Sequence, residues 1–147
     1  MTLQHSGGII VIVIKRVTVT EVNDLEENKM ANFNKVSVAN GARTELHDKL
    51  QLTGAEVSVN NLPAGASVPF VHYHKKNEEI YFVTAGKGKA VIDGETVELK
   101  AGDWLRISPA GRRQFFAAAD EGISYICIQV RENSLEEYTA DDAGIEQ

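Results

Sequence analysis

The sequence is poor in cysteine and has no long hydrophobic segment, and both absences exclude classes of protein. Cys127 is the one cysteine among 147 residues, which excludes an intrachain disulfide framework and a multi-cysteine zinc site. The densest apolar run, Ile9–Ile14, is far shorter than the roughly 20 residues that span a bilayer. Lys15 and Arg16 follow this run, whereas a signal peptide carries its basic residues before a longer apolar stretch. We therefore expect a cytoplasmic protein with no membrane partner.

Basic residues are missing from the C-terminal segment and do not cluster elsewhere. The chain has 15 Lys and Arg against 21 Asp and Glu, for a formal net charge of -6. Residues 132–147 contain acids but no Lys or Arg, so the rest of the chain is close to neutral. Because nucleic-acid binding depends on the neutralisation of phosphates by Lys and Arg, we expect no nucleic-acid partner.

Short apolar runs separated by Gly, Pro, Asn and Asp indicate an all-β fold. A chain of 147 residues has the length of one ordinary domain. Runs at this spacing are typical of a sandwich or barrel rather than of βαβ units, and Asp93-Gly94 is a strong hairpin signal. The predicted strands are Ile9–Ile14, Val17–Val22, Lys35–Val38, Leu52–Asn60, Phe70–His74, Ile80–Thr84, Gly88–Ile92, Thr96–Leu99, Trp104–Ile107, Arg113–Ala117 and Ser124–Val130.

The chain divides into an N-terminal extension, a barrel and an acidic C-terminal segment, which we place at residues 1–34, 35–131 and 132–147. Glu45–Leu50 fits either a loop or a short helix. Ile9–Ile14 is apolar at every position, so both of its faces need burial. A strand added to the sheet of another subunit would bury both, and we predict a homodimer. There are two alternatives. The run could form an edge strand within the same chain, or it could be sequence that precedes a truer start of the protein, such as Met30.

Two histidines and a glutamate form the strongest functional pattern. His72 and His74 stand at positions i and i+2 of a predicted strand, so they share one face with their Cα atoms about 6.5 Å apart. Four residues separate His74 from Glu79, enough for a tight connection that returns the chain beside the first strand and brings the carboxylate to the same face. Such a set can bind a divalent cation and leaves positions open for water, substrate or O₂. The alternative is two solvated histidines at a strand end, followed by a charged turn.

Two spaced motifs in this region resemble those of the cupins. The first motif consists of Gly65, His72, His74, Glu79 and Gly86. The second consists of Gly102-Asp103 and Pro109-Ala110-Gly111. Each motif is one residue longer than the family pattern, and the resemblance covers roughly residues 50–130. It implies the cupin double-stranded β-helix, a jelly-roll barrel built from two sheets.

The resemblance also implies a metal site. It makes His72, His74 and Glu79 metal ligands, and Gln114 stands where the family has a histidine as its fourth ligand. The site would have three strong ligands plus Gln114 or water. Its cofactor would be a divalent metal ion, and iron, zinc, manganese, nickel and copper all suit these donors. Retention of the motif by chance, with no metal bound, is the alternative.

Residues near the motif could line a pocket for a small molecule. Tyr81 and Val83 share a face with Glu79 through the two-residue period of a strand, and Phe116 shares one with Gln114. Tyr81 is the candidate catalytic residue, because its hydroxyl could donate a proton or a hydrogen bond to a substrate. A tyrosine that only bonds to the backbone is the commoner case.

Three arginines and the cysteine complete the candidate pocket. Arg106, Arg112 and Arg113 could bind a substrate carboxylate through their guanidinium groups. Because Arg112 and Arg113 lie in a predicted turn, we expect these two to be solvated and Arg106 to be the pocket residue. Cys127 shares a strand face with Gln129. It is either a buried inert thiol or a neighbour of the pocket.

Three functions remain open. The first is a metal-dependent enzyme, since dioxygenase, isomerase and decarboxylase activities all occur among cupins. The second is a binding module that holds a small molecule without turnover. The third is a metal-independent sugar isomerase or epimerase in which His72 or His74 transfers protons together with Tyr81. The fold does not choose among them.

Overall fold

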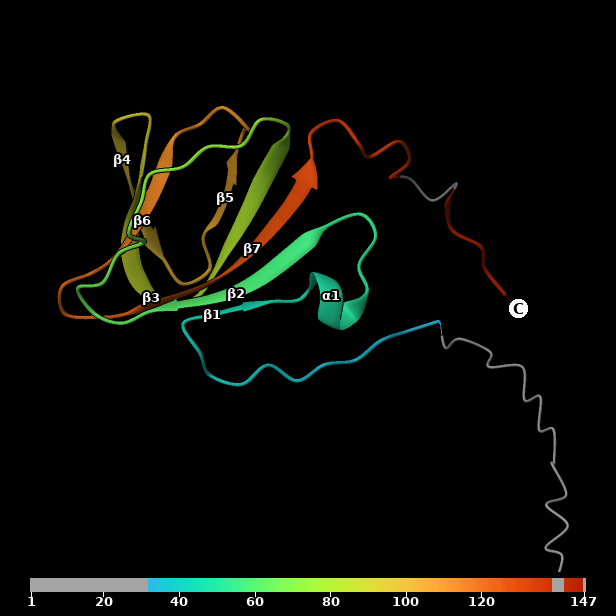
Figure 1. The fold of residues 1–147 in the computed structure, drawn as a ribbon, viewed down its shortest axis with the longest axis horizontal. Coiled ribbons are helices and arrows are strands. Elements are labelled where there is room, and N and C mark those ends of the chain that lie inside the picture. The colour runs from blue at the N-terminus through green and yellow to red at the C-terminus, as the bar shows by residue number, and fades with distance from the viewer. Residues whose placement is uncertain (1–31, 139–141, 147) are drawn as a thin grey trace, which may run out of the picture. The chain divides into compact units, whose positions relative to one another are not determined.

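The computed structural model describes residues 32–138 and 142–146. This part of the chain contains seven β-strands and one short helix (Figure 1). Their bounds are β1 Arg43–Glu45, α1 His47–Leu50, β2 Glu56–Leu62, β3 Asn77–Ile92, β4 Glu95–Lys100, β5 Trp104–Ile107, β6 Arg113–Ala117 and β7 Ile123–Arg131. The all-β prediction is confirmed. None of the described residues belongs to a helix long and apolar enough to cross a membrane, and the predicted strands Ile9–Ile14 and Val17–Val22 lie outside the described residues.

All strand pairs are antiparallel, and they form two sheets that share β3. Sheet A has the order β1-β2-β7-β3-β5. Sheet B has the order β4-β3-β6. Because β3 crosses from one sheet into the other, the two sheets wrap around a common interior, as the curvature of the strands in Figure 1 shows.

Glycines allow β3 to bend between the sheets. A register shift against β7 lies just before Gly86, whose φ is +74°. A Cβ atom at Gly86 would lie 1.9 Å from a backbone carbonyl oxygen of the turn before β7, and one at Gly88 would lie 2.1 Å from a carbonyl oxygen of β6. Only glycine permits these approaches. The predicted strands Ile80–Thr84 and Gly88–Ile92 are therefore two halves of one bent strand.

The core fills the barrel interior and centres on three aromatic rings. The rings of Tyr81 and Phe115 stack with their centroids 4.4 Å apart, and those of Phe115 and Tyr125 stack at 5.0 Å. These residues come from β3, β6 and β7, so the stack joins both sheets. The other buried members of this core are Val83, Ala90, Leu99, Ile107, Ile123 and Cys127. Stacked aromatic pairs contribute about 0.5–1.5 kcal/mol beyond the burial of their surface.

Two predicted strands are wrong, and an ambiguous segment is helical. Lys35–Val38 is not a strand, and Val38 is 38% exposed, so the segment lacks the buried face that stabilises a strand. Phe70–His74 forms only an isolated bridge at His72. The segment Glu45–Leu50 contains helix α1.

Candidate metal centre

His72 and His74 lie on an extended segment that runs beside β6. The backbone N–H of His72 donates to the Arg113 carbonyl oxygen at 3.1 Å, and the N–H of Arg113 donates back at 2.9 Å. The N–H of His74 donates to the carbonyl oxygen of Pro109 at 2.9 Å. These bonds hold both histidines although the segment is not a continuous strand. Their side chains are 32% and 26% exposed, so solvent reaches both imidazoles.

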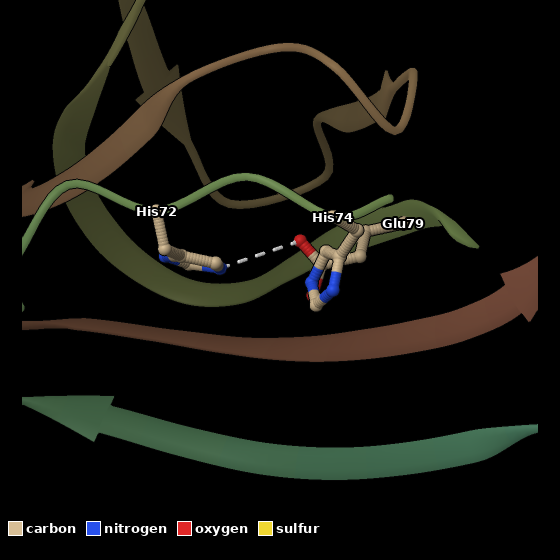
Figure 2. Close-up of side chains that lie close together, drawn as sticks. All are labelled: His72, His74 and Glu79. Atoms are coloured by element: carbon tan, nitrogen blue, oxygen red, sulfur yellow. Dashed lines mark hydrogen bonds and ion pairs between the residues drawn. The ribbon is translucent and has the colours of Figure 1, made fainter. Parts of the chain in front are cut away.

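Glu79 comes from the part of β3 that belongs to sheet A. It pairs with Ile107 of β5 and with Gln129 of β7, whereas His72 pairs with β6 of sheet B. The expected tight return of the chain beside the histidine segment is therefore wrong. Glu79 is only 6% exposed, and Figure 2 shows the ring of His72 directed toward the Glu79 carboxylate. The site is thus assembled from segments that belong to different sheets.

The three side chains converge on one point. His74 Nε2 lies 3.0 Å from Glu79 Oε1, and His72 Nε2 lies 3.8 Å from Oε2. The two imidazole centroids are 5.4 Å apart. One donor atom from each residue lies within 4.8 Å of the other two. Donors about 2.1 Å from one ion lie at most about 4.2 Å apart, so a small inward movement would bring all three to bonding distance.

The two carboxylate oxygens of Glu79 have different partners. Oε2 accepts hydrogen bonds from Arg113 Nε at 2.9 Å, from Arg113 Nη2 at 2.5 Å and from the Tyr81 hydroxyl at 2.5 Å. Oε1 faces His74 instead. Because Oε2 is saturated with donors, Oε1 is the oxygen that remains for an ion or a ligand.

Arg113 is a fully buried cation, which corrects the expectation that it is solvated. Its exposed fraction is 0%, and its Nη1 donates to two carbonyl oxygens of the turn before β6, at 2.7 and 3.3 Å. Burial acts to raise the pKa of Glu79, but the Tyr81 hydroxyl and the Arg113 guanidinium outweigh it and hold that pKa below its ordinary value. Glu79 is therefore an ionised carboxylate paired with a buried cation.

Gln114 does not join the three ligand candidates. Along β6 the buried side chains are Arg113 and Phe115, so the alternation of the strand turns Gln114 and Phe116 the other way. The Gln114 amide nitrogen donates to the Val68 carbonyl oxygen at 2.8 Å. The expectation that Gln114 occupies the fourth ligand position does not match this geometry, and Arg113 is the β6 residue that reaches Glu79.

Two predicted pocket residues also lie on the outside of the barrel. Phe116 shares the outer face of β6 with Gln114, as the period predicts, and Lys89 Nζ lies 5.6 Å from its ring centroid. Arg106 is exposed and forms ion pairs with Glu78 and Glu132. Neither side chain faces the histidines, because each belongs to the outward set of its strand.

The imidazoles differ in their surroundings. Burial lowers the pKa of His72, which favours the neutral ring, and its Nδ1 is buried with no hydrogen-bond partner among the described residues. His74 has Gln129 beside it, whose amide nitrogen lies 2.9 Å from Nδ1 and 3.0 Å from Nε2. Gln129 points inward from β7, and the sequence analysis did not name it as a site residue. The alternation of this strand, which places Gln129 on the same face as Cys127, was the signal that could have identified it.

Tyr81, Val83 and Cys127 lie inside the barrel on neighbouring strands. Burial raises the pKa of Tyr81, so the phenol stays protonated and directs its one proton to Glu79. In this arrangement Tyr81 positions the carboxylate. Cys127 pairs with Tyr81 in the β3–β7 register, and burial raises the pKa of its thiol to about 12. Val83 is packed in the core.

This donor set fits a divalent cation. It offers two imidazoles, one of which has a buried nitrogen without a partner, and an ionised carboxylate with one oxygen not held by a cation. Neutral imidazoles and carboxylates are the ligands of zinc and of non-haem iron sites with open positions. Arg113 opposes binding through its charge, but it also fixes the carboxylate, as partners of metal ligands commonly do.

Comparison with known proteins agrees with this architecture. The family model described as Cupin domain matches residues 58–129. A solved cupin protein from Bacteroides fragilis is 61% identical, with a TM-score of 0.78, and the match covers 80% of this chain and 100% of that one. A solved cupin-like protein from Thermotoga maritima is 28% identical with a TM-score of 0.55, over 61% of this chain and 68% of that one.

A shorter match links the chain to an uncharacterised protein from Methanocaldococcus jannaschii. The two are 38% identical over 48 residues, which are 33% of this chain and 38% of that protein. This chain therefore aligns with less than half of that relative. The family assignment comes instead from the Bacteroides fragilis protein, which is matched over its whole length, and from the family model, whose matched range includes His72, His74 and Glu79. The chain belongs to the cupin family.

Proposed function

We propose that this cupin binds one divalent metal ion through His72, His74 and Glu79 and uses the site to bind or convert a small molecule. The observation that carries the proposal is the convergence of three donor atoms within 4.8 Å of one another. A metal ion bound there would polarise an oxygen-containing ligand or activate O₂. A dioxygenase-type reaction is one activity that such a site supports.

The chain's own residues prepare the site for a ligand. Arg113 and Tyr81 hold Oε2 of Glu79, so the carboxylate presents Oε1 in one orientation. Gln129 contacts the ring of His74 and restrains its rotation. A cation with three protein ligands would keep open coordination positions, and the partial exposure of both histidines would give a small molecule access to them.

A metal-free binding or proton-transfer site is the second candidate, and Arg113 is the observation that favours it. Next to Gln114, the β6 residue that stands where the family has its histidine, this chain places the buried guanidinium of Arg113 2.5 Å from Glu79. The Arg113 guanidinium already neutralises the Glu79 carboxylate, and this weakens the attraction of the carboxylate for a metal cation. In this alternative His72 or His74 would exchange protons with a bound small molecule, and metal would not be required.

Metal content distinguishes the two candidates. Untagged full-length protein would be loaded separately with Fe²⁺, Zn²⁺, Mn²⁺ and Ni²⁺, passed through a desalting column and measured by elemental analysis. We expect about one retained ion per chain, lost in His72→Ala and kept in His47→Ala. His47 is the matched control because it lies on the exposed helix α1 and pairs with Asp48 away from the site. Retention that is the same in both variants, or no retention of any ion, would refute the metal proposal.

The compartment and the ligand class complete the proposal. We place the protein in the cytoplasm, and the support is that its one cysteine is buried and unpaired, as is usual in reducing compartments. The partner is a small molecule rather than a nucleic acid, because the net charge is -6 and no basic run is present.

A further inference from the structure

Polar side chains continue along the inner face of sheet A, away from the candidate metal centre and toward its edge strand β1, which lies along β2 (Figure 1). Ser58 and Asn60 of β2 are both buried. In the strand register Asn60 lies opposite Arg43 of β1 and opposite Tyr125 of β7. Residues that pair across strands share one face of a sheet, so Arg43 belongs to the inward set of sheet A.

The buried Asn60 holds the guanidinium of Arg43 in place. Its amide nitrogen donates to the carbonyl oxygen of Ser58 at 3.3 Å and to the Ser58 hydroxyl at 3.0 Å. The amide oxygen is therefore left to face β1, where it accepts a hydrogen bond from Arg43 Nη1 at 2.9 Å. Buried amides and hydroxyls are costly unless their hydrogen bonds are made, and here those bonds fix a cation at the edge of the barrel interior.

The guanidinium of Arg43 already holds a carboxylate. Its Nε and its Nη2 each lie 3.1 Å from Glu45 Oε1. The two side chains are 55% and 65% exposed, and ion pairs as exposed as this contribute little to stability. Both residues line an open hollow beside α1, so a dissolved molecule can reach them. Glu45 thus marks a position where a carboxylate fits and from which it can be displaced.

Arg43 and the candidate metal centre border the same region of the interior. Burial is the largest cause of the pKa shifts of three groups there, those of His72, Tyr125 and Cys127. The positive charge of Arg43 acts to lower each of these pKa values, and the negative charge of Glu79 acts to raise each of them. Electrostatic influence weakens with distance, so Arg43 and Glu79 both lie near these three groups.

The wall of this region favours a ligand that is polar at its ends and apolar in the middle. The Tyr125 ring stacks on Phe115 with the centroids 5.0 Å apart, and Cys127 is a buried thiol that behaves as a small apolar group. A sugar or a phosphate needs hydrogen-bond partners on most sides. A short organic acid needs them only at its charged ends, and the planar fork of an arginine matches a carboxylate.

We propose that Arg43, held by Asn60, selects a small organic acid as the ligand of this barrel. The carboxylate of the acid displaces Glu45 from the guanidinium, and an oxygen at its other end meets the metal centre. The inference rests on the proposed function, since the ion bound by His72, His74 and Glu79 would hold that second oxygen. It narrows the small molecule to a carboxylic acid with a second oxygen donor, and it makes Glu45 an internal competitor of the ligand.

The test is isothermal titration calorimetry of the full-length protein, with and without Zn²⁺, using succinate, glutarate and adipate as probes of different length. The wild type with Zn²⁺ should bind at least one of these acids. It should bind the neutral diamide of that acid at least about 10-fold more weakly, because hydrogen bonds between charged groups are the stronger ones. Arg43→Gln should weaken binding of the acid at least about 10-fold.

Lys49→Gln is the matched control, because it removes the same charge from the same hollow but from helix α1. It should keep the wild-type affinity for the acid. Glu45→Gln should tighten binding at least about 3-fold, since it frees the guanidinium from an exposed ion pair, and a merely structural Arg43 would give no such gain. Circular dichroism should show all three variants folded like the wild type.

Three results would refute the inference. They are a wild type that binds none of the three acids, equal affinities in Arg43→Gln and Lys49→Gln, and no gain in Glu45→Gln. Failure of the metal proposal has a different signature. In that case Zn²⁺ would not change the affinity for the acid, which would still depend on Arg43. If instead the chain retains Zn²⁺ but binds the acid equally well in Arg43→Gln, the metal proposal stands and the role of Arg43 is refuted.

Discussion

Replacement of Arg113 by methionine should destabilise the barrel by about 3–5 kcal/mol, the usual cost of removing one partner from a buried ion pair. The guanidinium is completely buried and supplies two of the donors that Glu79 Oε2 accepts. In the variant, the carboxylate of the nearly buried Glu79 side chain would keep its charge without a cation. Methionine fills much of the same volume, so the loss reports the charge rather than a cavity.

The assay is thermal and urea unfolding followed by circular dichroism. At about 3 °C per kcal/mol for a chain of this size, the expected decrease in Tm is about 9–15 °C. Arg112→Met is the control, because Arg112 is exposed and its loss should change the stability by no more than about 0.5 kcal/mol. A second substitution, Glu79→Gln in the Arg113→Met background, removes the stranded charge and should restore at least about 2 kcal/mol.

Two results would contradict this reasoning. An Arg113→Met variant as stable as Arg112→Met would mean that the ion pair contributes nothing to the folded state. A double variant that is no more stable than Arg113→Met would mean that the loss comes from packing or from the two carbonyl contacts of the guanidinium. In that case the charge of the Arg113 guanidinium would not be what stabilises Glu79 in the folded protein.

Three further predictions concern the ligand position, the thiol and the bend in β3. Arg113→His should tighten Zn²⁺ binding, measured by competition with a chelating dye, whereas Gln114→His should not. Of these two β6 residues, Arg113 points toward Glu79 and Gln114 points away from it. Tighter binding in Gln114→His alone would refute the assigned orientation of β6. Cys127 should resist thiol reagents at pH 8 until the protein unfolds, since it is buried with a pKa raised to about 12, and rapid labelling of the native protein would contradict its burial. Gly86→Ala should cost about 3 kcal/mol in urea unfolding, the upper part of the usual range for overpacking, because its Cβ would meet a carbonyl oxygen at 1.9 Å. Gly94→Ala, which also has positive φ but open space, should cost only about 1–2 kcal/mol, and equal losses would exclude the clash as the cause.

Local patterns in the chain were sufficient for much of the fold. The bounds predicted for Trp104–Ile107 and Arg113–Ala117 are those of β5 and β6. Alternation of apolar residues and glycine-containing turns depend on neighbours in sequence, so they can be read without the tertiary structure. The strand predicted at Lys35–Val38 was wrong. The pattern indicates which face a strand would bury, but not whether a sheet edge is available to pair with that strand.

The grouping of His72, His74 and Glu79 was also available from the sequence, but the reason for it was not. A tight hairpin would have brought these residues together locally. Instead the backbone of the histidine segment pairs with β6 at His72, and Glu79 projects from sheet A. The motif identifies residues that meet, whereas the bonds that hold them come from strands far apart along the chain.

The choice between Arg113 and Gln114 shows where sequence reasoning ends. The period of two places residues 113 and 115 on one face of β6 and residue 114 on the other, yet a shift of one residue exchanges the faces. Two residues separate Gly111 from Gln114, as in the family pattern between its glycine and its histidine, so spacing alone selected Gln114. The stack of Phe115 on Tyr81 and Tyr125 turns that face inward and carries Arg113 with it.

The sequence by itself determined the all-β class, the cupin motifs and the three residues that converge, because each depends on the order of neighbouring residues. Only the tertiary structure decided that a buried Arg113 neutralises Glu79 and that the pairing of β1 with β2 places Arg43 beside the buried Asn60. The physical reason is the same in both cases. Register and facing between distant strands are chosen by the packing of the whole barrel, since the local period fixes only which residues share a face.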